Sequence, residues 1–353
     1  MTDRTETKEA TAAPTEVDVV DVVDVVEHAY DPLVEGAPDA PVDREERRAL
    51  VIGEALIDIV RRADGSVSEH PGGSPANVAL GLGRLGRGVD LLTWFGRDAH
   101  GRLLTEHLAA SGVVIVPGSD GASRTSVAAA TLDADGVATY AFDLAWQIPE
   151  RWTSPPAPPL VVHTGSIAAV LEPGGPDVAN IVAAHRGSAT ITYDPNLRPS
   201  LMPRAEVTRP VVEALVALAD VVKVSDEDLA WLDPGTAPLD TARRWATAGP
   251  GLVVVTRGGE GATALTHGGG RLDVPAPRVV VADTVGAGDS FMGGLIDGLW
   301  SAGLLGADRR VALRTVDDTT LRQLLERCAQ IAAITVSRPG ADPPRLAELD
   351  AKA

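Results

Sequence analysis

The chain has little cysteine, few aromatic residues and no long hydrophobic run. Cys328 is the only cysteine among 353 residues, which excludes an intramolecular disulfide and a zinc site built from paired cysteines. Such a chain is typical of a reducing compartment, so we expect a cytoplasmic protein. No hydrophobic run approaches the ~18 residues of a membrane span, and the acidic amino terminus lacks the basic and apolar regions of a signal peptide. We therefore expect no membrane partner.

Basic residues are also scarce, with 31 Lys and Arg against 49 Asp and Glu, for a net charge of -18. Nucleic acid binding needs clustered Lys and Arg, so this balance argues against a nucleic acid partner. It does not exclude a phosphate-bearing small molecule held by backbone N–H groups.

Half of the net charge lies in residues 1–48, which carry 14 acidic and 5 basic side chains and so a net charge of -9 of the total of -18. Residues 1–47 are rich in Thr, Glu, Ala, Pro and Asp, and we expect a disordered acidic tail. The repeat "VDVVDVVDVVE" at 17–27 leaves a second interpretation open, a short β-prone or partly helical patch that docks on a partner.

From residue 48 onward the pattern predicts a single α/β domain, 48–353, with a doubly wound, mainly parallel sheet. Residues 49–60 have the pattern of a central strand, and further strands are expected in 89–96, 159–166, 189–196, 220–225 and 252–259. Helical patterns at 176–186, 204–219 and 240–248 separate several of these runs. Residues 125–143 break the alternation with two strand-like runs around the turn signal "DADG". We expect them, with residues near 60–70, to form a small β lid.

Two phosphate-binding patterns can be dismissed. "GLGRLG" at 81–86 matches GxGxxG, but the preceding residues have a helical pattern, so the motif falls within a helix or at its end instead of after a strand. The chain contains no GxxxxGK[ST] motif, which excludes an ordinary P-loop.

"GAGDSF" at 286–291 is a more specific signal. It follows the β-branched run "VVVADTV" at 279–285, which we expect to form a strand, and it precedes a helical pattern. A strand, a glycine turn and a helix start in this order are typical of an anion site. Gly286 and Gly288 would let the backbone approach a phosphate. Asp289 could then take a proton from a hydroxyl that attacks the phosphorus. An N-cap aspartate after a glycine turn is the alternative.

A second glycine pair occurs in "PGGSPANVALGLGRLG" at 71–86. The N–H groups of Gly72 and Gly73 and the amide of Asn77 could bind hydroxyl groups. A glycine turn with an Asn on the helix surface is the alternative.

Together the two stretches resemble the two signature regions of the ribokinase-like (PfkB) family of carbohydrate kinases, over residues 50–344. Within that family the chain is most similar to bacterial fructokinases, on "GEALID", "GGSPANVALGLGRLG", "FGRDAHG", "YDPNLRPSL", "KVSDEDLAWL", "VTRGGEGA" and "DTVGAGDSFMGG". The resemblance implies an enzyme that uses ATP with Mg²⁺, and in some relatives K⁺. It also implies a homodimer formed through the lid.

The resemblance implies a role for each matching residue. The catalytic base matches Asp289, and the anion hole matches Gly286, Ala287 and Gly288. Contacts to the sugar match Asp58, Gly72, Gly73 and Asn77, with Asp194, Asn196 and Arg198 in a DxNxR pattern at the mouth of the site. The ATP site matches Ser225, Asp228, Thr256, Gly258 and Gly261. Asp283 matches a monovalent cation position.

One departure concerns magnesium. Many members have an NxxE pattern connected with Mg²⁺, whereas this chain has Ser225 and the shorter carboxylate of Asp228 in "SDED". The chain therefore keeps a carboxylate at this position but departs from the family's magnesium pattern.

The expected reaction transfers the γ-phosphoryl group of ATP to the primary hydroxyl of fructose, giving fructose 6-phosphate. A kinase for ribose or for a sugar acid such as 2-keto-3-deoxygluconate is the first alternative, and the acid would need an added cation, for which Arg124 and Arg198 are candidates. A sugar-binding regulator without catalysis is the second alternative. It would be expected to lack Asp289 or the glycine hole, and both are intact.

Overall fold

The computed structural model describes residues 47–133 and 138–350, and its largest element is a sheet of nine strands in the order β13-β12-β11-β10-β9-β8-β1-β4-β5. All neighbours from β5 to β11 are parallel, and β12 and β13 continue the sheet antiparallel at one edge. The strands are β1 Ala49–Ile52, β4 Val89–Leu92, β5 Val113–Ile115, β8 Val161–Gly165, β9 Thr190–Asp194, β10 Val221–Ser225, β11 Leu252–Thr256, β12 Ala262–Thr266 and β13 Arg271–Val274.

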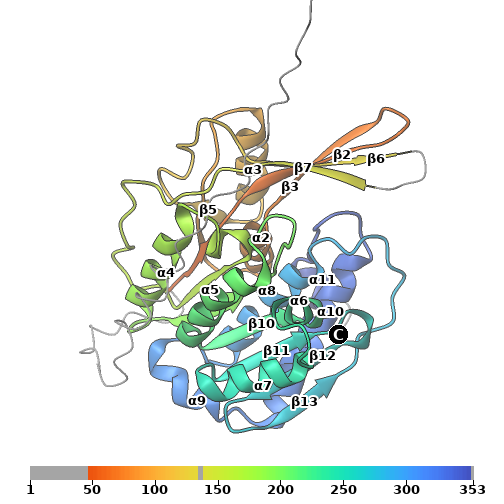
Figure 1. Ribbon diagram of the computed structural model, residues 1–353. Coiled ribbons are helices and arrows are strands. Elements are labelled where there is room, and N and C mark those ends of the chain that lie inside the picture. The colour runs from red at the N-terminus through yellow and green to blue at the C-terminus, as the bar shows by residue number, and fades with distance from the viewer. Residues whose placement is uncertain (1–46, 134–137, 351–353) are drawn as a thin grey trace, which may run out of the picture.

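Helices cover both faces of this main sheet (Figure 1). Val51 and Val254 point into one core, which α2, α3, α8 and α10 close, and Leu50 and Val253 point into the other, which α4 to α7 close. The helices are α2 Ser74–Arg84, α3 Ala99–Ala109, α4 Gly174–His185, α5 Ala205–Leu218, α6 Asp226–Leu232, α7 Pro238–Ala248, α8 Ala287–Ser301, α9 Arg310–Arg314, α10 Asp318–Val336 and α11 Leu346–Asp350, with short 3-10 turns η1 Ser166–Ala169, η2 Gly258–Glu260 and η3 Ala307–Arg309. The predicted doubly wound fold is confirmed.

A second sheet of four strands, in the order β3-β2-β6-β7, projects from the body of the molecule (Figure 1). Its strands are β2 Leu56–Arg61, β3 Val67–Gly72, β6 Val127–Leu132 and β7 Ala138–Asp143. The two segments expected to form a lid thus contribute all four strands. Most of the turn signal "DADG" lies outside the described residues, as does the acidic tail with its repeat at 17–27.

The expectation of one central strand over 49–60 was wrong. β1 ends at Ile52 in the main sheet, and β2 begins at Leu56 in the small sheet. The chain turns between them at Gly53, where a Cβ would collide with the ring of Pro75. Both strands are largely buried, so their hydrophobic pattern runs on without marking the change of sheet.

The strand expected at 279–285 was also wrong. The described chain has no strand between Val274 and the start of α8, and Val280 is 88% exposed. Instead the N–H groups of Ala282 and Asp283 donate to the carbonyl of Val336 at the end of α10. The valines therefore lie in a loop that has no neighbouring strand to pair with.

The "GLGRLG" motif lies in the last turns of α2 and just beyond it, as its helical context predicted. A Cβ at Gly83 would collide with the carbonyl oxygen of Ser111, so this glycine allows close packing of the backbone. Within the described ranges, no helix combines the length and hydrophobicity needed to cross a membrane.

The order of the main sheet reverses beside β1. From β1 the chain adds β4 and β5 on one side and later adds β8 to β11 on the other. In sheets of this kind, ligands bind at the carboxyl ends of the strands next to the reversal. The loops after β1, β8, β9, β10 and β11 are therefore where a functional site is expected.

Candidate active site

The amino terminus of α8 provides an opening for an anion. Gly286 caps the helix in the left-handed conformation, with φ of 75°, and a Cβ there would lie 2.6 Å from the Cβ of Ala341. The N–H groups of the first turn lack acceptors within the helix, and the helix dipole adds partial positive charge. Gly286, Ala287 and Gly288, the expected anion hole, form this helix start.

Asp289 lies in the first turn of α8 and is 5% exposed. Its Oδ1 accepts hydrogen bonds from Ser74 Oγ at 2.7 Å and Asn196 Nδ2 at 3.1 Å, and its Oδ2 accepts one from Asn77 Nδ2 at 2.8 Å. Gly286 caps the helix without a side-chain bond, so the alternative of Asp289 as an N-cap is wrong. A carboxylate has about four lone-pair positions, and the fourth, on Oδ2, is left for a ligand.

Of the three donors to Asp289, Ser74 was not singled out from the sequence, and Asn196 was named only as part of the DxNxR pattern. Ser74 opens α2 directly after the glycine pair, and Asn196 follows β9. Asn196 has a φ of 38°, a conformation that asparagine adopts more readily than most residues. Its Nδ2 also donates to Ser74 Oγ at 2.7 Å. Asn77 was expected to contact sugar hydroxyls, and its amide nitrogen also donates to Asp289.

Asp58 and the glycine pair lie in the small sheet and at its junction with α2. Asp58 is on β2, and its carboxylate covers Gly72 so closely that a Cβ on Gly72 would collide with it. Burial raises the pKa of Asp58 to about 6, against the charges of His70 and Arg198. Gly73, with φ of 102°, caps α2 and lies against the backbone of residues 54 and 55.

Asp194 lies deeper than expected. It has no exposed area, and Lys223 Nζ donates to its Oδ2 at 2.9 Å. Burial raises the pKa of Asp194 to about 6, although the ammonium of Lys223 acts in the opposite direction. A direct contact with substrate, expected for Asp194, does not fit this position because no surface is left for a ligand to touch. Sequence reasoning overlooked Lys223, whose signal was a lone charge in the apolar run "VVKVS".

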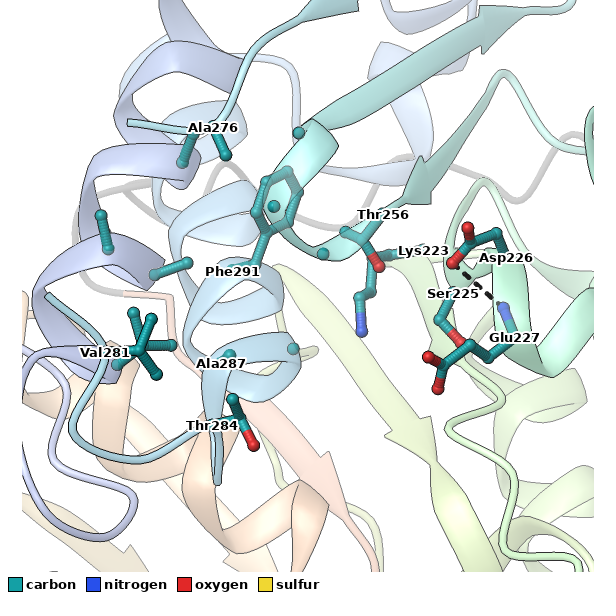
Figure 2. Close-up of a pocket in the computed structure, with 18 of the residues that line it drawn as sticks. Lys223, Ser225, Asp226, Glu227, Thr256, Ala276, Val281, Thr284, Ala287 and Phe291 are labelled. Atoms are coloured by element: carbon teal, nitrogen blue, oxygen red, sulfur yellow. Dashed lines mark hydrogen bonds between the residues drawn. The ribbon is translucent and has the colours of Figure 1, made fainter. Parts of the chain in front are cut away.

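A cavity of about 840 Å³ extends from the start of α8 toward the ends of β10 and β11 (Figure 2). One part is apolar, with Phe291 of α8 and Val336 of α10 in its wall, and another is polar, with Lys223 and Thr256. Gly258 and Gly261, expected at the ATP site, border it together with Thr256. An apolar half beside an anion-binding helix end suits a ligand with a flat base and phosphate groups.

Ser225 and Asp228 border the same cavity and form a capping box at the start of α6. Ser225 Oγ accepts from the N–H of Asp228, and the Asp228 carboxylate accepts from the N–H groups of Ser225 and Leu197. Within the described residues, no group of three or more His, Cys, Asp or Glu side chains could hold a metal ion. The single carboxylate of Asp228, with the hydroxyl of Ser225, fits a Mg²⁺ that arrives on nucleotide phosphates, since such an ion needs only one or two carboxylates from the protein.

Arg198 is exposed at the cavity mouth, and its Nη1 donates to Asn196 Oδ1 at 2.7 Å. It is therefore linked through Asn196 to Asp289. Asp283 lies just before the anion hole, where Oδ1 accepts from the N–H of Val285 and Oδ2 from that of Gly340. Asp283 thus joins the loop before α8 to the loop after α10.

Glu54 is a further residue that the sequence reasoning did not single out. It is 5% exposed, and its carboxylate accepts from the N–H groups of Ser74 at 3.2 Å and Ala168 at 3.3 Å. Burial raises the pKa of Glu54 to about 7. It fixes the start of α2, which carries two of the donors to Asp289.

The chain is similar in sequence and in structure to known carbohydrate kinases. Residues 46–347 match the family described as pfkB family carbohydrate kinase. A fructokinase from Rhizobium leguminosarum bv. trifolii is 34% identical over 282 residues, covering 77% of this chain and 85% of that protein. The crystal structure of fructokinase with bound ATP from Xylella fastidiosa is similar with a TM-score of 0.73 and 25% identity, over 86% of this chain and 97% of that chain. A fructokinase double mutant from Vibrio cholerae O395, in a form with fructose, ADP and potassium ion bound, is similar with a TM-score of 0.69 and 25% identity, over 87% of this chain and 98% of that chain.

Proposed function

Because this chain belongs to the pfkB family of carbohydrate kinases, we propose that it transfers the γ-phosphoryl group of ATP to the primary hydroxyl of fructose, giving fructose 6-phosphate and ADP. The family membership agrees with the resemblance drawn from the motifs. The observation that carries the proposal is the Asp289 carboxylate, held by three donors in the first turn of α8.

In this mechanism, ATP lies in the 840 Å³ cavity, with its base in the apolar part near Phe291 and its terminal phosphate at the start of α8. The fructokinase of similar fold has ATP bound, which supports ATP as the nucleotide. The N–H groups of the first turn of α8 hold the phosphoryl oxygens, and the loop of Thr256, Gly258 and Gly261 lies beside the nucleotide. When it arrives with ATP, Mg²⁺ would neutralise part of the phosphate charge, and Asp228 on the cavity wall is the carboxylate that would hold it.

Asp289 accepts the proton of the attacking hydroxyl at Oδ2, the oxygen with an open lone-pair position. Ser74 and Asn196 occupy Oδ1, and Asn77 occupies the other position on Oδ2, so the carboxylate cannot rotate away from the hydroxyl. The sugar oxygen then bonds to the γ-phosphorus while the bond from that phosphorus to ADP breaks.

The sugar lies between Asp289 and the small sheet, where Asp58, Gly72, Gly73 and Asn77 surround the remaining hydroxyls. Arg198 closes the mouth of the site. We assign the small sheet a role as a lid whose closure excludes water, the competing acceptor.

The small sheet also supports a homodimer. Tyr140 is 63% exposed and Phe142 is 37% exposed on β7, and their rings stack with centroids 6.1 Å apart. Burying both rings against a second copy would remove apolar area from water. Light scattering coupled to gel filtration tests this directly, since a monomeric mass at micromolar concentration would contradict it.

Two further assignments complete the proposal. Asp283, beside the anion hole, would hold a monovalent cation; the similar fructokinase structure from Vibrio cholerae has a potassium ion bound. The single thiol, Cys328, is free and buried, which fits a cytoplasmic location.

A sugar acid is a weaker candidate for the acceptor. Arg124 is already paired with Asp143, with Nε to Oδ2 at 2.7 Å, and Arg198 is held by Asn196. Both guanidinium groups therefore already have a partner within the protein, which makes them weaker candidates for binding a substrate carboxylate.

The test is ADP production with fructose, ribose, adenosine, tagatose and 2-keto-3-deoxygluconate as acceptors. We expect fructose to give the highest kcat/KM, with the phosphate on the 6-position by NMR. A higher kcat/KM for another acceptor would contradict the fructose assignment while leaving the kinase assignment intact.

A further inference from the structure

Lys223 is a charged residue in the middle of the buried strand β10. Its side chain is 3% exposed, and its neighbours in the strand, Val222 and Val224, are fully buried. Burying an ammonium costs free energy that a hydrophobic side chain at the same place would not. Packing alone therefore does not account for a lysine here.

The Lys223 ammonium lies beside the start of α8. A Cβ at Gly288 would lie 2.7 Å from Lys223 Nζ. The side chain extends from β10 toward the opening that Ala287 and Thr284 border (Figure 2). Within the part of the chain that the structure describes, Nζ makes one hydrogen bond, to Asp194. An ammonium has three N–H donors, so two are left to face the cavity.

We propose that Lys223 is a catalytic residue whose ammonium donates hydrogen bonds to the γ-phosphoryl group during transfer, and that Asp194 positions it. This inference rests on the proposed function, because it requires ATP with its terminal phosphate at the start of α8. It adds a side-chain cation to a phosphate site that otherwise consists of backbone N–H groups.

The charge changes of the reaction give this cation its effect. The hydroxyl oxygen bonds to the γ-phosphorus, its proton goes to Asp289, and the electron pair of the broken bond stays on the leaving oxygen of ADP. In the transition state, negative charge is spread over the phosphoryl oxygens, within reach of the Asp289 carboxylate. The phosphoryl oxygens and the Asp289 carboxylate are both negative and repel each other, and an ammonium beside Gly288 offsets this repulsion. Because Asp194 already holds the ammonium in place, the side chain does not have to move during the reaction.

A purely structural ion pair is the competing explanation, and replacing Lys223 alone does not separate the two. That variant leaves the Asp194 carboxylate buried without its cation, which destabilises the fold whatever Lys223 does in catalysis. The informative variant is the double substitution Lys223→Met with Asp194→Asn, which removes both charges and keeps the side chains close in volume.

The matched control lies at the opposite end of the same strand. Asp220 precedes β10 and pairs with Arg310, with Nε to Oδ1 at 2.6 Å. The double substitution Arg310→Met with Asp220→Asn also removes a partly buried ion pair, but away from the cavity. We expect this control to lower Tm and to leave kcat within about threefold of wild type.

For the Lys223→Met and Asp194→Asn double variant we expect a folded protein with kcat lower by about 10², since losing one donor to a developing oxyanion typically costs 10²–10³. The KM for the sugar should stay within about threefold. Single Asp194→Asn keeps the ammonium and should retain more activity than the double variant. A folded double variant with kcat within threefold of wild type would overturn the proposal, as would an Asp194→Asn variant as inactive as a well-folded double variant.

Slow ATP hydrolysis without any sugar provides a second readout. It needs the same phosphoryl site but no particular acceptor. If fructose proves a poor substrate while hydrolysis falls in the Lys223→Met and Asp194→Asn variant, the acceptor assignment fails and the role of Lys223 stands. If hydrolysis by that variant equals wild type, the role of Lys223 is refuted.

Discussion

Replacing Asp289 with asparagine tests the geometry around this carboxylate. The substitution keeps the size of the side chain and turns one oxygen into an NH₂ group. If the amide oxygen takes the place of Oδ1, it still accepts from Ser74 and Asn196, and the NH₂ group meets the amide nitrogen of Asn77. Asn77 can then turn its own amide and present oxygen. The structural cost should therefore be small, about 1 kcal/mol.

The chemical cost should be much larger. The NH₂ group stands where Oδ2 would accept the hydroxyl proton, and it can only donate. Removal of a general base typically lowers the rate by ~10²–10⁴, equal to ~2.7–5.4 kcal/mol at 1.36 kcal/mol per decade. We expect this loss in kcat, with ATP affinity close to wild type because the backbone N–H groups of α8 remain.

The assay measures kcat with saturating fructose and MgATP, ATP affinity by calorimetry, and a melting curve. Asp297→Asn is the matched control, since Asp297 is on the same helix, is 2% exposed and pairs with Arg87 at 2.7 Å. That variant should have a lower Tm than wild type and the same kcat. A folded Asp289→Asn protein that keeps more than about a tenth of wild-type kcat would refute the role of Asp289 as base.

Three further predictions follow from other parts of the molecule. Deleting residues 1–45, which precede the segment matched by the family model, should leave kcat/KM within about threefold, or ~0.7 kcal/mol, and a large loss in a folded truncation would contradict this. Asn77→Ala should lower kcat by about tenfold or more, because it removes one of three donors to Asp289, and it should also raise the KM for the sugar. A change in KM alone would limit Asn77 to sugar binding. Glu54 has a pKa raised from 4.5 to about 7 in the folded protein, so its contribution to stability is present below pH 4.5 and is lost as pH rises to about 7. Glu54→Gln should remove this dependence, worth roughly 3 kcal/mol, and equal slopes of Tm against pH for both proteins would exclude Glu54 as its source.

Much of the fold could be predicted because strands buried on both faces form continuous hydrophobic runs. The runs that contain β8, β9, β10 and β11 are of this kind, and the helices expected at 176–186, 204–219 and 240–248 match α4, α5 and α7 closely. The prediction of one strand over residues 49–60 was wrong because buried strands have the same hydrophobic pattern in either sheet. The prediction of a strand at 279–285 was wrong because runs of valine also occur in loops. The antiparallel edge formed by β12 and β13 was not predicted, since an edge has no distinctive hydrophobic period.

The residues of the site divide in the same way. Local signals placed Asp289 and the glycines before it in one helix start. What the sequence did not provide is which side chains from distant segments reach Asp289, as Ser74 and Asn196 do from 215 and 93 residues away. The burial of a side chain could not be predicted either. The sequence pattern placed Asp194 at the mouth of the site, but the structure buries it beneath the site in an ion pair with Lys223.

The pairing of β2 with β6 also affects how the chain folds during synthesis. Ile57 pairs with Val127, about 70 residues later, and β4 and β5 lie between them in the sequence. The red to yellow part of Figure 1 thus contains the whole small sheet and one side of the main sheet, and the green to blue part contains the residues that line the 840 Å³ cavity. A chain emerging from the ribosome therefore has the proposed sugar side before it has the proposed nucleotide side. Until β8 emerges, the edge of β1 lacks its partner, and we expect this interval to be when two growing chains most readily pair with each other.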